Sequence, residues 1–560
     1  MSIKTDFSWK VAGEAGYGIM VTGDMFSRAC MRSGAYTFDY PEYPSLIRGG
    51  HNTYQTRISD REVFSQVREV NILIALNQDG VDLHKDELAE DAILIFDPEN
   101  TKTDFANSIP LPMAEIVAKF NGDKIMRNTV ALGASLAFVC VDFEILKELI
   151  REAFSKKGED VVKHNLDIAK AGYDFVGKKK CAFKVPAKAV KKKMLMSGND
   201  AISLGAIKAG CKFMSTYPMT PATAIMHYFA KHEEDMGLIM KHTEDEIAGI
   251  LMAIGAGHAG ARAMAATSGG GFALMVEALG MAAMTETPVV VVVAQRPGPS
   301  TGLPTWTEQG DLRFVLHASQ GDFFRVVLTP GDHEECFEAG VQAFNYAERY
   351  QTPVIILTDK YLGESFRSVE PFSFSATVNR GKLILSPAAD YKRYEFSDDG
   401  ISPRALPGSV VFGVFSNEHN KDGDFTEDPE MRNRMNEKRW AKIETASKEI
   451  GDKVRYYGDK NPDVTVFSWG STKGPVLEAM KLAKGLKIGL VHTFCMMPFP
   501  TEEISEYLKS AKRAVLIEGN IGAQFGGLIR EYTGVEIKDK LLKYNGRPFY
   551  PEEILKFLKK

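Results

Sequence analysis

The sequence lacks closely spaced cysteines and long hydrophobic runs, and these absences exclude several classes of protein. None of the six cysteines forms a CxxC pair, so we expect no zinc site or iron–sulfur cluster built from this chain alone. We predict that the thiols are buried and pack as small apolar side chains. The purest apolar run, at 288–294, is far too short to cross a bilayer. The polar amino end is unlike a signal peptide, so the prediction is a cytoplasmic protein without a membrane partner.

The sequence also lacks the excess of positive charge that binds nucleic acid. It has 68 Lys and Arg against 73 Asp and Glu, a net charge of -5. The hydrophobic fraction of 44% and the charged fraction of 25% are ordinary for a globular protein. A length of 560 residues predicts about three domains.

Alternating strand-like and helix-like segments divide the chain into three regions. Residues 1–185 alternate and are followed by a basic linker at 186–197. Residues 198–385 alternate again, 386–450 are polar and irregular and end in a charged helix, and 451–560 alternate once more. Strands followed by helices form right-handed βαβ units. The expected fold class is therefore α/β, with three parallel-sheet domains.

The middle region gives the clearest pattern. Strands are expected at 211–216, 237–243, 261–268 and 288–295, each but the last followed by a helix, at 221–232, 246–260 and 270–286. The β-branched run at 288–295 is typical of a central strand in a parallel sheet. Thr220 is the expected N-cap of the first helix, with Pro221 at its first position. Ligands of such sheets bind at the carboxyl ends of the strands.

Four of these strand ends carry unusual chemistry. The segments are Tyr217–Thr220, Glu244–Glu246, Thr267–Gly271 and Gln295–Thr301. Each has an ordinary explanation by itself: a helix cap, a first-turn carboxylate favoured by the helix dipole, a tight turn and a surface ion pair. Because all four lie at one edge of the sheet, their convergence predicts a binding site with hydroxyl, carboxylate and guanidinium groups.

The same segments carry a resemblance to a known family. The stretches YPMTPAT at 217–223, HTEDEIAGILMAIGAGHAGARAMAATSGGG at 242–271 and QRPGPSTGLPTWTEQGDL at 295–312 resemble the alpha subunit of 2-oxoacid:ferredoxin oxidoreductases. The likeness is greatest to 2-oxoglutarate:ferredoxin oxidoreductase (2-oxoglutarate synthase) with a gamma domain fused at the amino end. It implies a gamma domain at 1–185, a thiamine diphosphate pyrimidine-binding domain at 198–385 and a transketolase C-terminal-like domain at 451–560.

The resemblance implies a thiamine diphosphate site shared with a partner. Glu246 matches the carboxylate that hydrogen-bonds the pyrimidine nitrogen, and a carboxyl group in a dry pocket can share a proton with that nitrogen. Glu244 is the alternative for this role. Tyr217 and Pro218 are expected to line the cofactor.

The resemblance also implies how the substrate is held. Arg296 and Thr220 match the anchors of the 2-oxoacid carboxylate, which a guanidinium can bind in bidentate fashion. Thr301 in the same loop is expected to line the pocket. Arg48, in a glycine-flanked turn, would meet the second carboxylate of 2-oxoglutarate; the alternative is an exposed arginine on a hairpin.

The metal motif of thiamine diphosphate enzymes, GDG followed by Asn, is absent, and NQDG at 77–80 is better explained as a turn. The resemblance therefore implies a beta subunit that carries Mg²⁺, the diphosphate site and a [4Fe-4S] cluster, in a dimer of alpha–beta heterodimers with no metal site on this chain. The implied reaction is the reversible oxidative decarboxylation of 2-oxoglutarate to succinyl-CoA and CO2, with coenzyme A as co-substrate and ferredoxin as electron acceptor.

Two alternatives remain at this stage. One is the same chemistry on pyruvate, branched-chain or aryl 2-oxoacids. The other is a noncatalytic assembly subunit that binds coenzyme A or a nucleotide.

The glycines at 13, 16 and 18 suit the binding of a phosphate near the start of a helix. Their spacing is not that of the dinucleotide-binding motif GxGxxG. The family resemblance links this loop to coenzyme A access.

Overall fold

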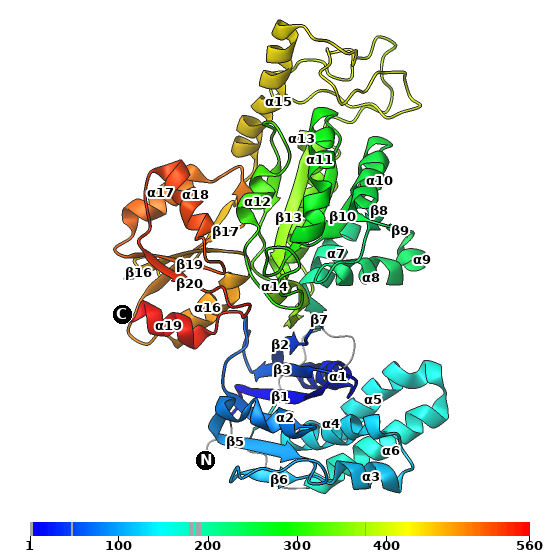
Figure 1. Cartoon of the computed structure of the whole chain (residues 1–560), viewed down its shortest axis with the longest axis vertical. Coiled ribbons are helices and arrows are strands. Elements are labelled where there is room, and N and C mark those ends of the chain that lie inside the picture. The colour runs from blue at the N-terminus through cyan, green and yellow to red at the C-terminus, as the bar shows by residue number, and fades with distance from the viewer. Residues whose placement is uncertain (1–3, 46–48, 178–182, 186–191, 376) are drawn as a thin grey trace. The chain divides into compact units, whose positions relative to one another are not determined.

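The computed structural model describes residues 4–45, 49–177, 183–185, 192–375 and 377–560 (Figure 1). The chain forms two compact units. The first comprises Met1–Met196, Ser365–Pro371 and Tyr550–Glu553, and the second comprises Ser197–Glu364, Phe372–Phe549 and Ile554–Lys560. Both are α/β, and the described residues form three mainly parallel sheets, which confirms the predicted fold class.

The first unit is built on an eight-stranded sheet of order β6-β5-β4-β1-β3-β2-β14-β7. Its strands are β1 (Phe7–Glu14), β2 (Tyr36–Glu42), β3 (His51–Ser59), β4 (Val70–Ala75), β5 (Leu88–Phe96), β6 (Ser108–Pro110), β7 (Met194–Ser197) and β14 (Phe366–Val369). The pairs β1–β4, β4–β5 and β5–β6 are parallel, whereas β1–β3, β2–β3 and β2–β14 are antiparallel. The antiparallel part is an addition that the alternating pattern did not predict.

Six α-helices belong to the described part of the first unit. They are α1 (Ile19–Arg32), α2 (Gln78–Asp82), α3 (Met113–Lys119), α4 (Arg127–Phe138), α5 (Phe143–Phe154) and α6 (Glu159–Val176). The helices α4 and α6 approach so closely that a side chain at Gly133 would overlap the Ala169 carbonyl, and one at Gly172 would overlap the Val130 carbonyl. The two glycines therefore permit this backbone-to-backbone packing.

The first sheet of the second unit has seven strands in the order β18-β12-β13-β11-β10-β8-β9. They are β8 (Cys211–Thr216), β9 (Ile239–His242), β10 (Arg262–Thr267), β11 (Val289–Gln295), β12 (Val326–Leu328), β13 (Pro353–Asp359) and β18 (Cys495–Met497). The β-branched strand β11 is central and buried throughout, as predicted. Val290 and Val292 pack in a core with α7 and α13, whereas Val291 and Val293 pack on the opposite face with α10 and α11.

The helices of this region are α7 (Gly198–Lys208), α8 (Thr223–Lys231), α9 (Glu233–Met236), α10 (Glu246–His258), α11 (Gly269–Met284), α12 (Leu312–His317), α13 (His333–Tyr350) and α14 (Lys360–Glu364). The expected start of α8 is wrong, because Ala222 and not Thr220 is its N-cap and Pro221 precedes the helix. The carbonyls of Thr220 and Pro221 instead accept hydrogen bonds from Arg296 and Asn199, which keeps both residues outside the first helical turn.

The second sheet of this unit has the order β15-β17-β16-β19-β20. Its strands are β15 (Val454–Gly458), β16 (Val464–Trp469), β17 (Ile488–Thr493), β19 (Ala514–Glu518) and β20 (Asp539–Leu542), and the helices that follow in this part of the chain are α16 (Lys473–Leu482), α17 (Thr501–Ser510), α18 (Gln524–Thr533) and α19 (Pro551–Leu558). Short 3-10 helices lie at Lys85–Glu87, Lys124–Met126, Ser155–Lys157 and Gly470–Thr472.

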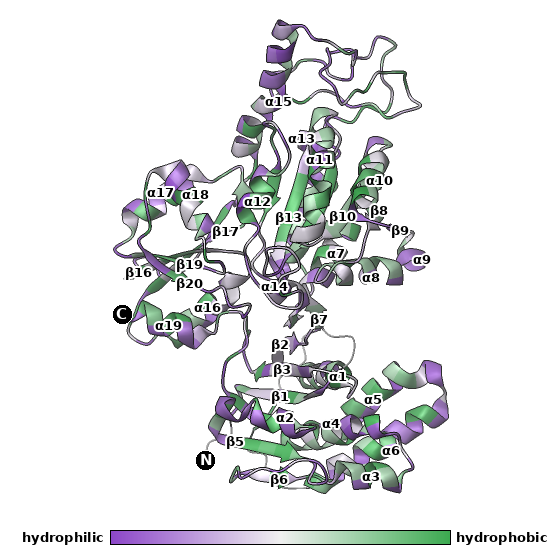
Figure 2. Cartoon of the chain, in the orientation of Figure 1, coloured by the Kyte–Doolittle hydropathy of each residue, from purple (hydrophilic) through white to green (hydrophobic). Residues whose placement is uncertain are grey.

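Buried ion pairs fasten the surrounding segments to these sheets. Glu335 at the start of α13 binds Lys473 at 2.5 Å and His492 at 2.9 Å, which joins the two sheets of the second unit. The long, largely hydrophilic helix α15 (Pro429–Glu449) (Figure 2) directs Lys438 and Lys442 at the buried Glu286, at 2.6 and 2.7 Å.

Among the described residues the cysteines differ from the prediction at one position, and Cys181 lies outside those residues. Cys30, Cys211, Cys336 and Cys495 are free and buried, as expected. Cys140 is disulfide-bonded, so the expectation of a packed thiol is wrong there, because sequence spacing does not reveal which cysteines the fold brings together. Among the described residues no helix is both long and apolar enough to span a membrane.

Candidate functional site

Glu246 is a buried carboxylate at the first position of α10. The preceding Asp245 caps the helix, and its side chain accepts a hydrogen bond from the Ala248 N–H at 2.8 Å. Glu246 is only 3% exposed, and its Oε1 has no hydrogen-bond partner among the described residues. Glu244 is exposed. An unpaired buried carboxylate oxygen is costly, so Glu246 and not Glu244 has the features of a ligand-binding group.

The glycine-rich start of α11 packs against the carboxylate of Glu246. A Cβ at Gly271 would overlap both Glu246 Oε1 and Thr267 Oγ1. The Thr267 hydroxyl also lies 3.9 Å from the sulfur of Met219, which follows β8. The strand ends of β8 and β10 and the start of α10 therefore meet, as the sequence predicted for this edge of the sheet.

Arg296, directly after β11, completes the convergence. Its Nη1 donates a hydrogen bond to the Thr220 carbonyl at 2.8 Å, so the structure brings Arg296 and Thr220 together. Burial lowers the pKa of Arg296, while the nearby Asp311 opposes that effect.

The other residues predicted to line the site are less buried. Thr301 and Tyr217 are exposed, and Pro218 is half-buried. Arg48 lies outside the described residues.

Two carboxylates in the loop after Arg296 were not singled out by the sequence analysis. Burial raises the pKa of Asp311 to about 6, although the charge of Arg296 opposes the shift. Burial and the charge of Asp311 both raise the pKa of Glu308. Both residues lie in the stretch that carries the family resemblance, but its spacing alone does not show that the loop returns to its own start.

The helices beside Glu246 expose a band of large apolar side chains. Ile247, Leu251 and Met252 on α10 and Leu274 on α11 are 40–50% exposed. The two helices contribute to the same core cluster, and a large exposed apolar patch marks a surface where another molecule binds. We call these four residues the apolar band.

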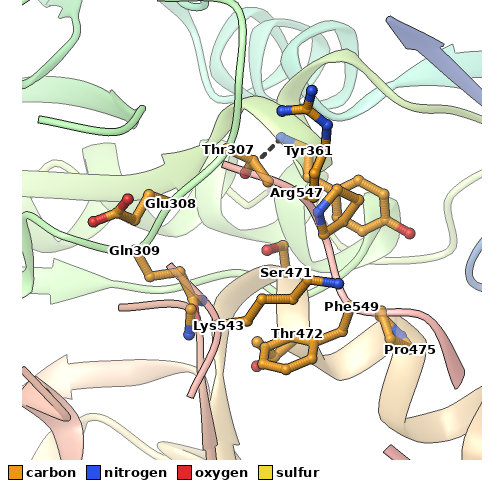
Figure 3. A pocket seen from close by; sticks show the side chains of 12 residues that line it. Thr307, Glu308, Gln309, Tyr361, Ser471, Thr472, Pro475, Lys543, Arg547 and Phe549 are labelled. Carbon is orange, nitrogen blue, oxygen red and sulfur yellow. Dashed lines mark hydrogen bonds between the residues drawn. The ribbon is translucent and has the colours of Figure 1, made fainter. Parts of the chain in front are cut away.

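A separate small pocket lies at the carboxyl ends of β16, β19 and β20 (Figure 3). Its volume of ≈ 20 Å³ is close to that of a single water site. Two of its hydroxyl groups are already engaged: the Thr307 hydroxyl donates a hydrogen bond to Asp359 at 3.2 Å, and the Thr472 hydroxyl donates one to the Trp469 carbonyl at 2.7 Å. The pocket is therefore a weaker candidate than the region around Glu246.

The first unit contains a larger cavity of ≈ 670 Å³ between α1, α4, α5 and α6. Gly18, the last residue of the predicted phosphate loop, lies on its wall together with Val21 and Phe154. Gly16 and Gly18 have φ values of 98° and 72°, a region that favours glycine. The loop conformation thus explains why glycine occupies these positions.

Comparisons with known family profiles match most of the chain. Family profiles described as "Pyruvate ferredoxin/flavodoxin oxidoreductase", "Pyruvate flavodoxin/ferredoxin oxidoreductase, thiamine diP-bdg" and "Pyruvate:ferredoxin oxidoreductase core domain II" match residues 8–175, 204–438 and 463–554.

Individual proteins match over nearly the whole chain. A 2-oxoacid:ferredoxin oxidoreductase subunit alpha from a Sulfolobus species is 34% identical over 98% of this chain and 95% of its own. The 2-oxoglutarate oxidoreductase subunit KorA of Mycobacterium tuberculosis is 28% identical over 98% of this chain and 90% of its own. The structure of 2-oxoglutarate:ferredoxin oxidoreductase from Magnetococcus marinus, with 2-oxoglutarate, coenzyme A and succinyl-CoA bound, superposes with a TM-score of 0.93 at 34% identity and covers 99% of both chains.

Proposed function

The chain belongs to the family of 2-oxoacid:ferredoxin oxidoreductase alpha subunits, and from this premise we propose that its substrate is 2-oxoglutarate. The proposed reaction is the reversible, coenzyme A-dependent oxidative decarboxylation of 2-oxoglutarate to succinyl-CoA and CO2, with electrons passed to ferredoxin. The observation that carries the thiamine diphosphate chemistry of this proposal is the buried Oε1 of Glu246, which has no partner among the described residues.

The region around Glu246 fits the aminopyrimidine of thiamine diphosphate. Glu246 offers an acceptor with no protein partner among the described residues, and the missing side chain of Gly271 leaves it room. In the proposed site, Glu246 shares a proton with the pyrimidine nitrogen, and Tyr217 and Pro218 flank the cofactor. Thiamine diphosphate, when bound, supplies the carbon nucleophile that attacks the 2-oxo group.

Arg296 is proposed to bind the carboxylate next to the 2-oxo group. Its hydrogen bond to the Thr220 carbonyl fixes one edge of the guanidinium and leaves other N–H groups for the substrate. Thr220 and Thr301 supply hydroxyl groups near this position. Arg48 is proposed, from its place in the sequence alone, to bind the distal carboxylate of 2-oxoglutarate.

The apolar band is proposed to dock a beta subunit. That subunit would supply Mg²⁺, the diphosphate site and the [4Fe-4S] cluster, and would cover Glu246 so that water is excluded.

We propose a dimer of alpha–beta heterodimers in the cytoplasm. In each alpha chain, residues 1–185 form the gamma domain, 198–385 the pyrimidine-binding domain and 451–560 the transketolase C-terminal-like domain. Coenzyme A is proposed to approach the glycine loop of the gamma domain.

The choice of 2-oxoglutarate is supported by the names of the KorA relative and of the Magnetococcus marinus enzyme. Pyruvate is the alternative, because the matching family profiles carry its name. Purification with the natural partner, followed by dye reduction with a panel of 2-oxoacids, distinguishes them by the ratio of kcat/KM values. A complex that contains no thiamine diphosphate and oxidises none of these acids would instead support a noncatalytic assembly role.

A further inference from the structure

The loop between β11 and α12 carries groups that are proposed to bind the substrate. It begins at Arg296, contains Thr301 and returns to the sheet at Asp311, whose backbone N–H donates to the side chain of Gln295 at 2.9 Å. Turns that follow β16, β19 and β20 hold this loop, and they belong to the same compact unit. We call the sheet of these three strands, with β15 and β17, the carboxyl-terminal sheet.

Gln309 joins the loop to the carboxyl-terminal sheet through both its backbone and its side chain. The residue is only 2% exposed. Its backbone N–H donates to the Gly519 carbonyl at 2.7 Å, and its Oε1 accepts a hydrogen bond from the Gly519 N–H at 2.8 Å. Its side-chain amide donates to the Trp469 carbonyl at 2.9 Å. Its backbone carbonyl accepts a hydrogen bond from Asn520 Nδ2 at 2.9 Å, so each polar group of Gln309 binds a turn of this sheet.

The two turns are shaped to receive the Gln309 side chain. A Cβ at Gly470 would lie 2.8 Å from Gln309 Nε2, and one at Gly519 would lie 3.1 Å from its Oε1. Gly470 also has a φ of 56°, which favours glycine. The turns are joined to each other, because the buried Glu518 accepts a hydrogen bond from the Trp469 indole at 3.1 Å. The carboxyl-terminal sheet therefore offers Gln309 a fixed binding position.

A second attachment lies nearer the middle of the loop. The Thr307 N–H donates to the Gly546 carbonyl at 3.2 Å. The guanidinium of Arg547 lies 3.1 Å from the centre of the Trp306 ring, a favourable cation–π contact. Thr307, Gln309 and Arg547 all line the small pocket in Figure 3. The loop is therefore attached to the carboxyl-terminal sheet at two places.

We propose that Gln309 is a positioning residue that holds the loop from Arg296 to Asp311 in the conformation that binds the 2-oxoacid. The inference rests on the proposed function, because it assigns the substrate to Arg296 and Thr301. A loop without the bonds of Gln309 adopts this conformation in only a fraction of the molecules, and the apparent affinity for the substrate falls by that fraction. Loss of the attachment therefore raises KM more than it lowers kcat.

The test compares Gln309→Met with Gln351→Met. Methionine has nearly the length of glutamine but makes neither of its side-chain hydrogen bonds to the turns. Gln351 is the matched control, because it is 1% exposed and its side-chain amide donates to the Ser402 carbonyl at 2.6 Å, yet it ends α13 and is not part of the loop. Mass spectrometry measures amide hydrogen exchange of residues 297–308 in the full chain. Dye reduction measures KM and kcat for 2-oxoglutarate in the complex with the natural partner.

The expected results separate the loop from general stability. In Gln309→Met, exchange of residues 297–308 should be faster, and KM should rise about tenfold, the effect of one hydrogen bond of ordinary strength, with a smaller change in kcat. Gln351→Met should leave both measurements unchanged. Arg547→Ala, at an exposed residue of the second attachment, should change exchange and KM in the same direction by a smaller factor.

Three outcomes would overturn the inference: unchanged exchange in a folded Gln309→Met, faster exchange without a rise in KM, or an equal rise in KM in Gln351→Met. If Gln309→Met fails to fold, Arg547→Ala decides, and unchanged exchange and KM in that variant overturn the inference. Failure of the proposed function gives a different result, in which exchange of the loop is faster in Gln309→Met but the unchanged complex oxidises no 2-oxoacid.

Discussion

The substitution Glu246→Gln should make the chain more stable and the enzyme much slower. Glutamine has nearly the same size as glutamate, so it fits beside Gly271. Its amide group, unlike a carboxyl group, cannot share an acidic proton with a pyrimidine nitrogen. Proton transfer by a positioned side chain contributes roughly 10²–10⁴-fold to a rate, so kcat/KM should fall by that factor.

The expected gain in stability has a separate cause. Glu246 buries a carboxylate with one oxygen unpaired, and leaving such a group without a partner costs about 1–3 kcal/mol. A neutral amide lowers the desolvation cost, so the free energy of unfolding of the isolated chain should rise by part of that amount. Active sites commonly trade stability for function in this direction.

Two assays check the pair of effects. Dye reduction by the complex measures kcat/KM, and urea unfolding of the isolated chain measures stability. Glu244→Gln is the matched control, because Glu244 is exposed two residues earlier and should change neither. An unchanged kcat/KM in Glu246→Gln, with thiamine diphosphate still bound, would refute the reasoning, and so would a loss of stability.

Three other predictions follow from the described contacts. Arg296→Lys should raise KM for the 2-oxoacid by about tenfold or more with a smaller effect on kcat in steady-state assays, since an ammonium cannot bind a carboxylate in bidentate fashion. Glu286→Gln should lower the free energy of unfolding in urea by about 3–5 kcal/mol, since it leaves the buried Lys438 unpaired. Because its lysine partners hold the pKa of Glu286 below its usual range, the stability that Glu286 contributes should be present above about pH 4.5 and be lost as the pH falls through the folded-state pKa. Leu274→Asp should abolish co-purification with the partner subunit while leaving the chain folded by circular dichroism.

Each of these has a control and a contrary result. Val411→Asp also places a charge on an exposed apolar residue, outside the apolar band, and should leave co-purification intact; equal losses in both variants would argue against the band as the docking surface. Glu444→Gln removes an exposed ion pair on α15 and should cost little, so an equal cost at Glu286 would contradict the role of burial. A KM unchanged in Arg296→Lys would remove Arg296 from substrate binding.

Much of the site could be predicted because its groups follow strands with clear patterns. The β-branched run of β11 identified the central strand, and the residues after β8, β10 and β11 met as expected. The start of α8 could not be predicted, since side chains of Arg296 and Asn199 bind carbonyls that a helix model assigns to the first turn. Whether Glu244 or Glu246 faces the site also depended on burial, which only the fold decides.

The features that sequence reasoning missed depend on contacts between distant residues. The loop after Arg296 returns to the sheet at Asp311, whose backbone N–H donates to the side chain of Gln295, and nothing in the spacing of these residues reveals that return. The disulfide bond of Cys140 and the antiparallel pairing of β1 with β3 likewise depend on tertiary approach. Local patterns predicted the elements, whereas these pairings required the folded chain.

The proposed role of Glu246 is to bind the pyrimidine ring of thiamine diphosphate where this chain meets a partner subunit. A structure of the complex with thiamine diphosphate measures this directly. Glu246 Oε1 should lie within about 2.6–3.2 Å of a pyrimidine nitrogen, and the partner should cover the apolar band. Thiamine diphosphate bound elsewhere, or a Glu246 carboxylate in contact with protein atoms alone, would contradict it.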